Sequence, residues 1–300
     1  MVDCRSSAQC GGGECQPVKR RNLVIVRAGD TSLHPEWLSG PGAGARNWDV
    51  LVNYFGDDPD KFRSGDAIRI DSKGPKWPSL HALIQANAGL IASYQRVWLP
   101  DDDLRCNCDD VNRLFEIFER EKLDLAQPSL RHQSYVSHMV TLHNGSFQLR
   151  YTNFIEVMAP CFTQESLKTL LPTFNANLSG WGLDYIWPRL LGSASRVAII
   201  DDIQVLHTRP VGAANYDAMK AQGITAWDEM NHLLDKYNVT KRRIVISEAI
   251  ATRSGRRISR GPGLLLRYGA GLVPAGLHFK GGILAFMRGW LSAMKHQLLN

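Results

Sequence analysis

The sequence has no apolar run long enough to cross a lipid bilayer. A membrane-spanning helix needs roughly 18 consecutive apolar residues, whereas charged residues or Gly/Pro clusters interrupt every apolar run here sooner. The stretch from Met1 to Gln16 is polar, so it also lacks the apolar middle of a secretory signal peptide. We therefore expect a soluble, cytoplasmic protein.

Closely spaced cysteine pairs of the CxxC type are also missing, although the chain contains 6 cysteines. In the reducing compartment that we expect, these cysteines should remain thiols. Cys4, Cys10 and Cys15 could bind zinc together with Cys106 or Cys108, but a frayed N-terminus accounts for them as well.

Acidic residues are nearly absent from the last part of the chain. Residues 241–300 contain 11 basic side chains and one acidic side chain, Glu248, whereas residues 1–240 contain 24 basic and 28 acidic side chains. The formal charge of +6 therefore comes from the tail, and the body is mildly acidic. With 44% hydrophobic and 21% charged residues, the composition is that of a globular protein. We predict a flexible segment at 1–20, one folded domain at 21–240 and a basic, partly amphipathic extension at 241–300.

Short apolar runs alternate with segments of helical periodicity, which indicates an α/β fold. The predicted strands are Asn22–Arg27, Trp48–Phe55, Arg96–Pro100, Leu123–Gln127 and Val197–Ile200. The predicted helix caps are Ser79, Asp109 or Asp110, Thr163, and Thr225 within a helix from Asn215 to Tyr237 that breaks at Gly223. Between 146 and 158 the period shortens toward two, which favours an antiparallel excursion. We predict a mixed, mainly parallel sheet with helices on both faces.

An acidic triplet, Asp101, Asp102 and Asp103, directly follows the strand predicted at Arg96–Pro100. In open parallel sheets, ligands bind beyond the carboxyl ends of the strands. The first and third side chains of an extended segment point the same way, so Asp101 and Asp103 can share one hard cation. A turn or a helix cap would need one carboxylate, and therefore the triplet favours a divalent metal site.

Two further features fit such a site. His207 follows a second apolar stretch, and imidazole with carboxylate oxygens suits Mn²⁺ or a related ion, although a single histidine is more often structural. In the loop from Gly180 to Asp184, Trp181 could stack on a sugar and Asp184 could accept a proton from a hydroxyl nucleophile. A structural interpretation fits equally well, in which Trp181 is a core anchor and Asp184 is a helix cap.

The order of these features resembles the GT-A fold of nucleotide-sugar glycosyltransferases, a Rossmann-related fold. Over residues 20–215 the chain is also similar to the family known as domain of unknown function 707. The segments that carry this similarity are Arg21–Leu38, Lys76-Trp77, Trp98–Asp103 and Gly180–Asp184. The fold resemblance implies a metal-dependent glycosyltransferase that moves a sugar from a nucleotide-sugar to a hydroxyl acceptor, in the synthesis of a glycan or surface polysaccharide.

The same resemblance implies roles for individual residues. Asp103 would bind Mn²⁺ or Mg²⁺ bridging the donor diphosphate, with Asp101 contacting the ion or the ribose and His207 completing the metal shell. Asp184 would be the acceptor-side base if configuration is inverted, and Trp181 and Gly182 would bind the acceptor. The other residues expected along the donor nucleotide are Arg27, Asp30, Asp57, Lys73 and Lys76.

Two other classes of function remain open at this point. A phosphohydrolase of the haloacid dehalogenase type also uses Asp-x-Asp, with Asp201-Asp202 as its later acidic pair. In such enzymes the motif follows the first strand and a Thr or Val stands where Arg105 is found here, so this reading fits less well. A non-catalytic nucleotide- or glycan-binding protein is the second alternative.

The basic tail has its own candidate partners. Basic residues interleaved with apolar and aromatic ones between Leu264 and Leu299 fit an interfacial segment on an anionic membrane surface, which would place the protein at the inner face of the membrane. A solvated helical extension or a dimerisation element fits almost equally well. No nucleic-acid-binding surface is recognisable.

Overall fold

The structure is a computed structural model that describes residues 20–298 except 64–66, 195, 211–222, 224 and 241. The cysteines at 4, 10 and 15 and the first part of the helix expected from Asn215 lie outside the described residues. Within the described part, Cys106, Cys108 and Cys161 are free thiols and all are buried.

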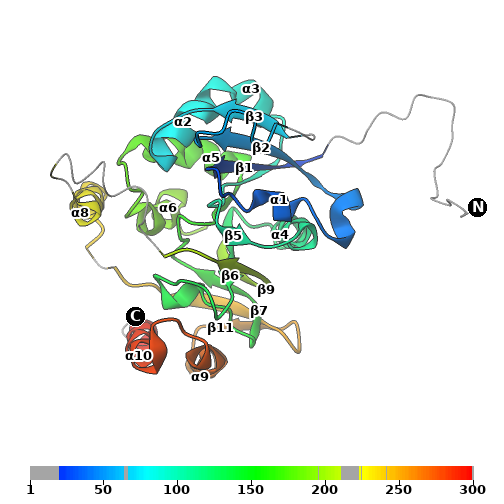
Figure 1. The fold of residues 1–300 in the computed structure, drawn as a ribbon. Helices are drawn as coiled ribbons and strands as arrows, with labels where there is room; N and C mark the ends of the chain where they lie inside the picture. Colours follow the sequence, from blue (N-terminus) through cyan, green and yellow to red (C-terminus); the bar gives the residue numbers. More distant parts are fainter. Residues whose placement is uncertain are drawn as a thin grey trace, which may run out of the picture.

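Strands and helices alternate through the first half of the chain (Figure 1). The strands are β1 (Asn22–Ala28), β2 (Trp48–Tyr54), β3 (Ile68–Asp71), β4 (Arg96–Trp98), β5 (Leu104–Arg105), β6 (Leu125–Leu130), β7 (Phe147–Thr152), β8 (Cys161–Thr163), β9 (Val197–His207), β10 (Ile246–Ala251) and β11 (Arg257–Ser259). The α-helices are α1 (His34–Trp37), α2 (Lys76–Ala86), α3 (Ala88–Ile91), α4 (Cys108–Arg120), α5 (Gln164–Leu170), α6 (Leu183–Leu191), α8 (Ala226–Lys236), α9 (Pro262–Leu272) and α10 (Gly282–Leu298). Short 3-10 helices are η1 (Pro41–Ala45), η2 (Met139–Thr141), η3 (Leu171–Asn175) and η4 (Val273–Leu277).

The strands form one mixed sheet in the order β11-β10-β7-β9-β6-β8-β4-β1-β2-β3, with β5 paired to β9. The pairs β2–β3, β1–β2, β1–β4 and β6–β9 are parallel. The pairs around β7, β8 and β10 are antiparallel. The predicted α/β class with a mixed sheet is therefore confirmed, as is the antiparallel excursion near residues 146–158.

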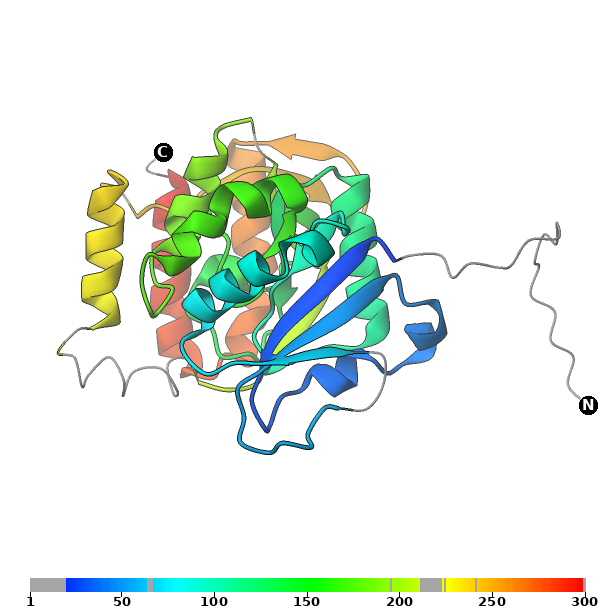
Figure 2. The same ribbon diagram turned by 90° about the horizontal axis from the view of Figure 1, so that it is seen from above.

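Alternate side chains of the central strand β1 enter two separate cores. Leu23 and Ile25 pack into one apolar cluster, and Val24 and Val26 pack into the other. Because successive side chains of a strand point to opposite faces, helices must cover both faces. Figures 1 and 2 show helices on either side of the sheet, with α4 packed in the second cluster and α2, α6 and α10 in the first.

Two helix starts differ from the predicted ones. Helix α2 begins at Lys76 after an N-cap at Pro75, so Ser79 does not cap it. Helix α4 is capped by Asn107, whose side chain accepts a hydrogen bond from the Asp110 backbone while the Asp110 side chain binds the Asn107 backbone. In this capping box Asp110 is the third helical residue and Asn107 is the cap. The prediction that Asp109 or Asp110 is the cap is therefore wrong. The predicted caps Thr163 and Thr225 are confirmed.

The sheet continues past the boundary expected at residue 240. Strand β10 pairs antiparallel with β7 and carries β11 on its other side. The region after 240 therefore contributes two strands to the same sheet before α9 and α10 follow. Within the described residues, no helix combines the length and the apolar character required to span a membrane.

Candidate functional site

A two-residue strand brings the acidic triplet to the end of β9. Residues Asp101 to Asp103 link β4 to β5, and β5 pairs antiparallel with the end of β9, with Leu104 opposite His207. The Trp37 indole donates a hydrogen bond to the Leu104 carbonyl at 2.7 Å, which fixes this short strand from the other side. The pairing places Asp103 and His207, which are distant in sequence, next to each other.

Asp103 and His207 form a buried pair. The distance between His207 Nε2 and Asp103 Oδ2 is 3.2 Å, and their side chains are 6% and 10% exposed, respectively. His207 Nδ1 lies 2.8 Å from the Tyr135 carbonyl, which can only accept, so Nδ1 carries a proton and Nε2 faces the carboxylate. Burial acts to lower the pKa of His207, but the hydrogen bond and charge of Asp103 outweigh it and raise that pKa.

The geometry of this pair suits a divalent cation. Two ligands at about 2.1 Å from an octahedral ion and at right angles lie about 3.0 Å apart, close to the 3.2 Å between Nε2 and Oδ2. The second carboxylate oxygen of Asp103, Oδ1, is buried and finds no hydrogen-bond partner among the described residues. The described residues contain no cluster of three His, Cys, Asp or Glu side chains arranged for a metal ion. An ion here would therefore need further ligands from substrate or water.

The other two carboxylates of the triplet point toward different cations. Asp101 Oδ1 lies 2.5 Å from Lys76 Nζ, which also donates to the Val157 carbonyl at 2.9 Å. Asp102 accepts a hydrogen bond from the Gly29 backbone at 2.8 Å and lies 3.2 Å from Arg209 Nη1. Burial raises the pKa of Asp102 to about 6. The three adjacent carboxylates thus avoid mutual repulsion because each has its own positive or donor partner.

A second pair of buried acids lies beside this triplet. Glu156 and Asp184 are 6% and 7% exposed, and Glu156 Oε2 finds no hydrogen-bond partner in the described part of the chain. Burial raises the pKa of Glu156 to about 7, although the nearby charge of His207 opposes this. Burial likewise raises the pKa of Asp184 to about 8, with a further increase from the charge of Glu156. Glu156 is thus electrostatically coupled to the triplet end of the site and to Asp184.

The sequence did not single out Glu156. Its signal was an acidic residue within an apolar stretch, Phe154-Ile155-Glu156-Val157, where a charge is unexpected. Asp184 lies in the first turn of α6 but does not cap it, because the N-cap is Gly182. His138 also lies close, with its Nε2 3.9 Å from Asp184 Oδ2.

The residues expected along the donor nucleotide are spread over the ends of β1 and β2. Arg27 is buried, which lowers its pKa to about 10, and its guanidinium donates to Asn53 Oδ1 at 2.6 Å and to the Gly74 carbonyl at 2.7 Å. Lys73 Nζ lies 2.6 Å from Asp57 Oδ1, and both side chains are exposed. Asp30 accepts a short hydrogen bond from Tyr54. These contacts hold the loops beyond β1 and β2 to one another.

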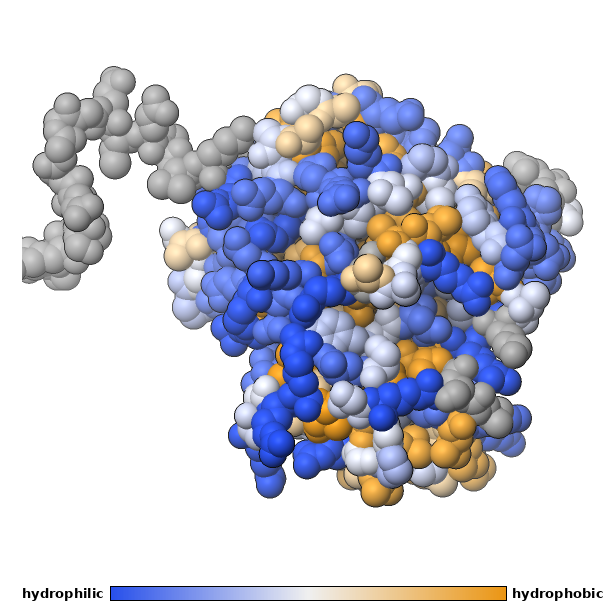
Figure 3. Space-filling view, turned by 180° about the vertical axis from the view of Figure 1, so that it is seen from behind, coloured by the Kyte–Doolittle hydropathy of each residue, from blue (hydrophilic) through white to orange (hydrophobic). Residues whose placement is uncertain are grey.

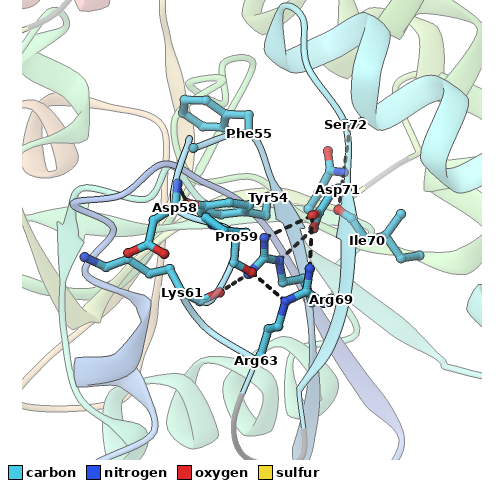
Figure 4. Close-up of polar contacts among 12 residues, drawn as sticks. Tyr54, Phe55, Asp58, Pro59, Lys61, Arg63, Arg69, Ile70, Asp71 and Ser72 are labelled. Atoms are coloured by element: carbon cyan, nitrogen blue, oxygen red, sulfur yellow. Dashed lines mark hydrogen bonds and ion pairs between the residues drawn. The ribbon is translucent and has the colours of Figure 1, made fainter.

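The loop between β2 and β3 folds over Tyr54 (Figure 4). The Arg69 guanidinium lies 3.9 Å from the centre of the Tyr54 ring and donates to Asp71 at 2.7 and 3.0 Å. The neighbouring Phe55 is 37% exposed at the end of β2, and the Arg27 guanidinium lies 5.0 Å from its ring centre. An exposed aromatic ring therefore stands at the edge of the sheet where the sequence led us to expect the nucleotide.

Packing accounts for both glycines of the Gly180–Asp184 loop. Gly180 has φ +79°, and a Cβ there would lie 2.2 Å from Trp77; Gly182 has φ +95° and would meet Leu233 at 3.2 Å. Trp181 is half-buried, with its ring 5.6 Å from that of Trp227 at a steep angle. The loop thus packs between α2 and α8, and it presents its tryptophan beside a second indole.

No protein-family model matches the chain, and no curated protein matches its sequence. Among solved structures, GalNAc-T7 crystallised with UDP, GalNAc and Mn²⁺ is similar with a TM-score of 0.50 at 8% identity, over 71% of this chain and 47% of the other. TarS of S. aureus in complex with UDP-GlcNAc has a TM-score of 0.43 at 11% identity, over 92% and 89% of the chains. A candidate nucleotide-diphospho-sugar transferase from Desulfovibrio desulfuricans G20 has a TM-score of 0.38 at 11% identity, over 72% and 99%.

The likeness to GalNAc-T7 defines a GT-A-like fold for this chain. The chain matches about half the length of that protein, and at 8% identity the likeness concerns the fold alone. Residues that carry chemistry have to be argued from the site itself.

Proposed function

We propose that this protein is a metal-dependent glycosyltransferase that uses a nucleotide-sugar donor. The single observation that carries the proposal is the buried Asp103–His207 pair at a strand end of a GT-A-like sheet. This pair combines a ligand spacing of 3.2 Å with a carboxylate oxygen that has no hydrogen-bond partner within the described part of the chain. A buried acceptor atom without a donor costs free energy. Such a cost is expected where a site is built for a ligand.

Asp103 and His207 would hold the ion, Mn²⁺ or Mg²⁺, which when bound stabilises the negative charge of the departing nucleoside diphosphate. Mn²⁺ accompanies UDP in GalNAc-T7, and a carboxylate with an imidazole suits that ion. The tether of His207 Nδ1 to Tyr135 keeps Nε2 turned toward Asp103. Asp101 would orient Lys76 toward phosphate or bind the ribose.

On the donor side, the exposed Phe55 ring would support the nucleotide base, and the loop that contains Asp30, Asp57 and Lys73 would border it. Arg27 would act mainly as a positioning residue, since its guanidinium already binds Asn53 and Gly74 and lies behind the Phe55 ring. Base stacking on an aromatic face tolerates different bases. This arrangement therefore leaves the nucleotide of the donor open.

On the acceptor side, Asp184 would take the proton from the attacking hydroxyl. A general base works best with a pKa near the operating pH, and that of Asp184 is raised to about 8 by burial. Trp181, with Gly182 behind it, would contact the acceptor ring, and Trp227, which is 56% exposed, extends that aromatic surface. If configuration is retained, Asp184 would bind the acceptor instead.

The phosphohydrolase alternative is less well supported. It requires Asp201-Asp202 near the acidic triplet, but Asp201 is fully buried and bound to Arg150 at 2.6 and 2.8 Å. A carboxylate committed to a buried guanidinium is a poor metal ligand. Asp201 therefore has a structural role in the fold and does not support a phosphohydrolase site.

The proposed function is tested by replacing Asp103. Asp103→Asn should reduce sugar transfer and nucleotide-sugar hydrolysis at least about a thousandfold, as expected when a charge-stabilising group is lost, with Mn²⁺ present and the melting temperature preserved. The matched control is Asp235→Asn, the same change at an exposed position of α8, which should retain full activity. Unchanged turnover of UDP- and GDP-sugars by Asp103→Asn would overturn the proposal. If the parent protein binds nucleotides but turns over no nucleotide-sugar, a non-catalytic binding function would be favoured instead.

A further inference from the structure

Exposed apolar side chains are concentrated in the two C-terminal helices. Of the 13 large hydrophobic residues that are exposed in the described part of the chain, 8 lie between positions 266 and 298. They are Leu266, Val273, Leu277, Ile283, Leu284, Met287, Leu291 and Leu298. Scattered apolar residues are normal on a protein surface, whereas a concentration of them marks an interaction site.

Four exposed apolar residues of α10 form an outward stripe. Leu284, Met287, Leu291 and Leu298 follow a spacing of three, four and seven residues, which places them on one helix face. Their exposed fractions run from 43% to 74%. An ordinary surface helix turns mainly polar residues outward, whereas the exposed side of α10 carries these four large apolar residues as well as polar ones.

The opposite face of α10 is already satisfied by the fold. Phe286 is buried, and a Cβ on Gly276 of η4 would lie 3.0 Å from its ring. The Trp290 indole donates to the Gly269 carbonyl of α9 at 3.0 Å. The Gln297 side chain accepts from the Ile246 backbone at 2.9 Å, which ties the helix end to β10. The helix therefore cannot rotate to bury its outer stripe without losing these contacts.

The charge around the stripe is of one sign. On α10, Arg288 directly follows Met287, and Lys295 lies four residues after Leu291. On α9, Arg267 lies next to Leu266. The sequence contains no acidic residue after Glu248. Figure 3 shows hydrophobic and hydrophilic side chains mixed at the lower end of the molecule, where Figure 1 places α9 and α10.

We propose that α9, η4 and α10 form a docking surface for an anionic lipid membrane. Apolar side chains that enter the headgroup region and flanking Lys and Arg that meet anionic lipids are the two contributions that bind interfacial helices. A second copy of the chain fits worse, because joining two such faces would bring the basic residues of both copies together, and neither α9 nor α10 supplies an acidic partner. This inference goes beyond the proposed transfer activity and does not require it.

Tyr135 connects the docking surface to the candidate site. Lys280, between η4 and α10, lies with its Nζ 3.5 Å from the centre of the Tyr135 ring. The carbonyl of the same Tyr135 accepts from His207. A membrane bound at this surface would therefore lie near the catalytic end of the sheet, which suits an acceptor carried by the membrane.

The test is co-sedimentation of the full chain with vesicles, without donor or metal, so that its outcome is independent of transfer activity. Vesicles of phosphatidylcholine with phosphatidylserine should bind the protein, vesicles of phosphatidylcholine alone should bind it much less, and added salt should release it. The double variant Arg288→Gln/Lys295→Gln should bind about thirtyfold more weakly at about 1 kcal/mol for each basic residue. Leu284→Ser/Leu291→Ser should also weaken binding.

Matched controls carry the same changes elsewhere on the surface. Lys168→Gln/Arg189→Gln, on α5 and α6, removes two exposed charges, and Leu90→Ser/Leu190→Ser removes two exposed leucines. Both controls should bind anionic vesicles like the parent. The proposal would be overturned if the protein bound both vesicle types equally or bound neither. It would also be overturned if the control variants lost as much binding as the helix variants. A dimer in solution that Leu284→Ser/Leu291→Ser dissociates would also overturn it, because the surface would then be an interface between copies.

Discussion

Two buried carboxylates along β9, Asp201 within the strand and Asp103 beside its last residue, differ in how completely their hydrogen bonds are satisfied. Asp201 in mid-strand accepts two hydrogen bonds from Arg150 and one from the Asn144 backbone at 2.9 Å, while Arg150 also donates to the Val140 and Leu142 carbonyls. Asp103, beside the last residue of β9, keeps one oxygen without a partner among the residues that the structure describes, as does nearby Glu156. A complete network stabilises the fold, whereas an incomplete one indicates a place for a ligand.

The complete network should show the largest effect on stability. Asp201→Asn leaves the Arg150 charge buried without its counter-charge, so the free energy of unfolding should fall by about 3 to 5 kcal/mol. Urea denaturation followed by tryptophan fluorescence measures this change. Replacing both partners, Arg150→Met with Asp201→Leu, removes the unpaired charge and should restore part of the loss, since the Asn144 N–H and the Val140 and Leu142 carbonyls would still lack their partners.

The exposed control for this change is again Asp235→Asn, which should alter stability by less than about 0.5 kcal/mol. If Asp201→Asn were as mild as this control, the buried pair would contribute nothing to stability and the contrast with Asp103 would disappear.

Replacing Glu156, which belongs to the incomplete network, should increase the free energy of unfolding instead of decreasing it. The size of this increase should depend on pH. Burial raises the folded-state pKa of Glu156 from 4.5 to about 7, so the folded protein holds this proton longer than the unfolded chain does. The destabilisation is absent well below pH 4.5 and grows as the pH rises through about 7. Glu156→Gln should therefore raise the free energy of unfolding by about 2 kcal/mol more at pH 8 than at pH 5.

Urea denaturation at the two pH values checks this expectation. Glu165→Gln, on the exposed side of α5, should show no such pH dependence. An equal gain for Glu156→Gln at both pH values would mean that burial does not penalise the ionised form of Glu156.

Local sequence signals predicted the parts of the fold that local chemistry determines. The runs Asn22–Arg27 and Trp48–Phe55 are apolar and β-branched because β1 and β2 are covered on both faces, and Thr163 and Thr225 cap their helices through their own side chains. Strands β3 and β11 were missed because they are short and half-exposed and each contains a charged residue among three or four positions. Their position depends on a neighbouring strand and not on their own pattern.

The candidate site was predictable as a set of residues but not as an arrangement. Asp103 and His207 each follow an apolar strand, so strand-end reasoning found both. Their contact depends on β5, whose two residues give no periodic signal. Glu156 was not found because the loop that carries it reaches the site through the pairing of β7 with β9. The basic tail was recognised by charge, but its two strands and its outward apolar stripe required the three-dimensional structure.

The most direct test of the central claim is calorimetric titration of the parent protein and of Asp103→Asn with UDP and GDP, with Mn²⁺ and with a chelator. The parent should bind one of these nucleoside diphosphates when Mn²⁺ is present and lose that binding with the chelator, and Asp103→Asn should behave like the chelated parent. Nucleoside diphosphate binding that is equally tight without a divalent ion, or that survives Asp103→Asn unchanged, would contradict a metal site built on Asp103 and His207.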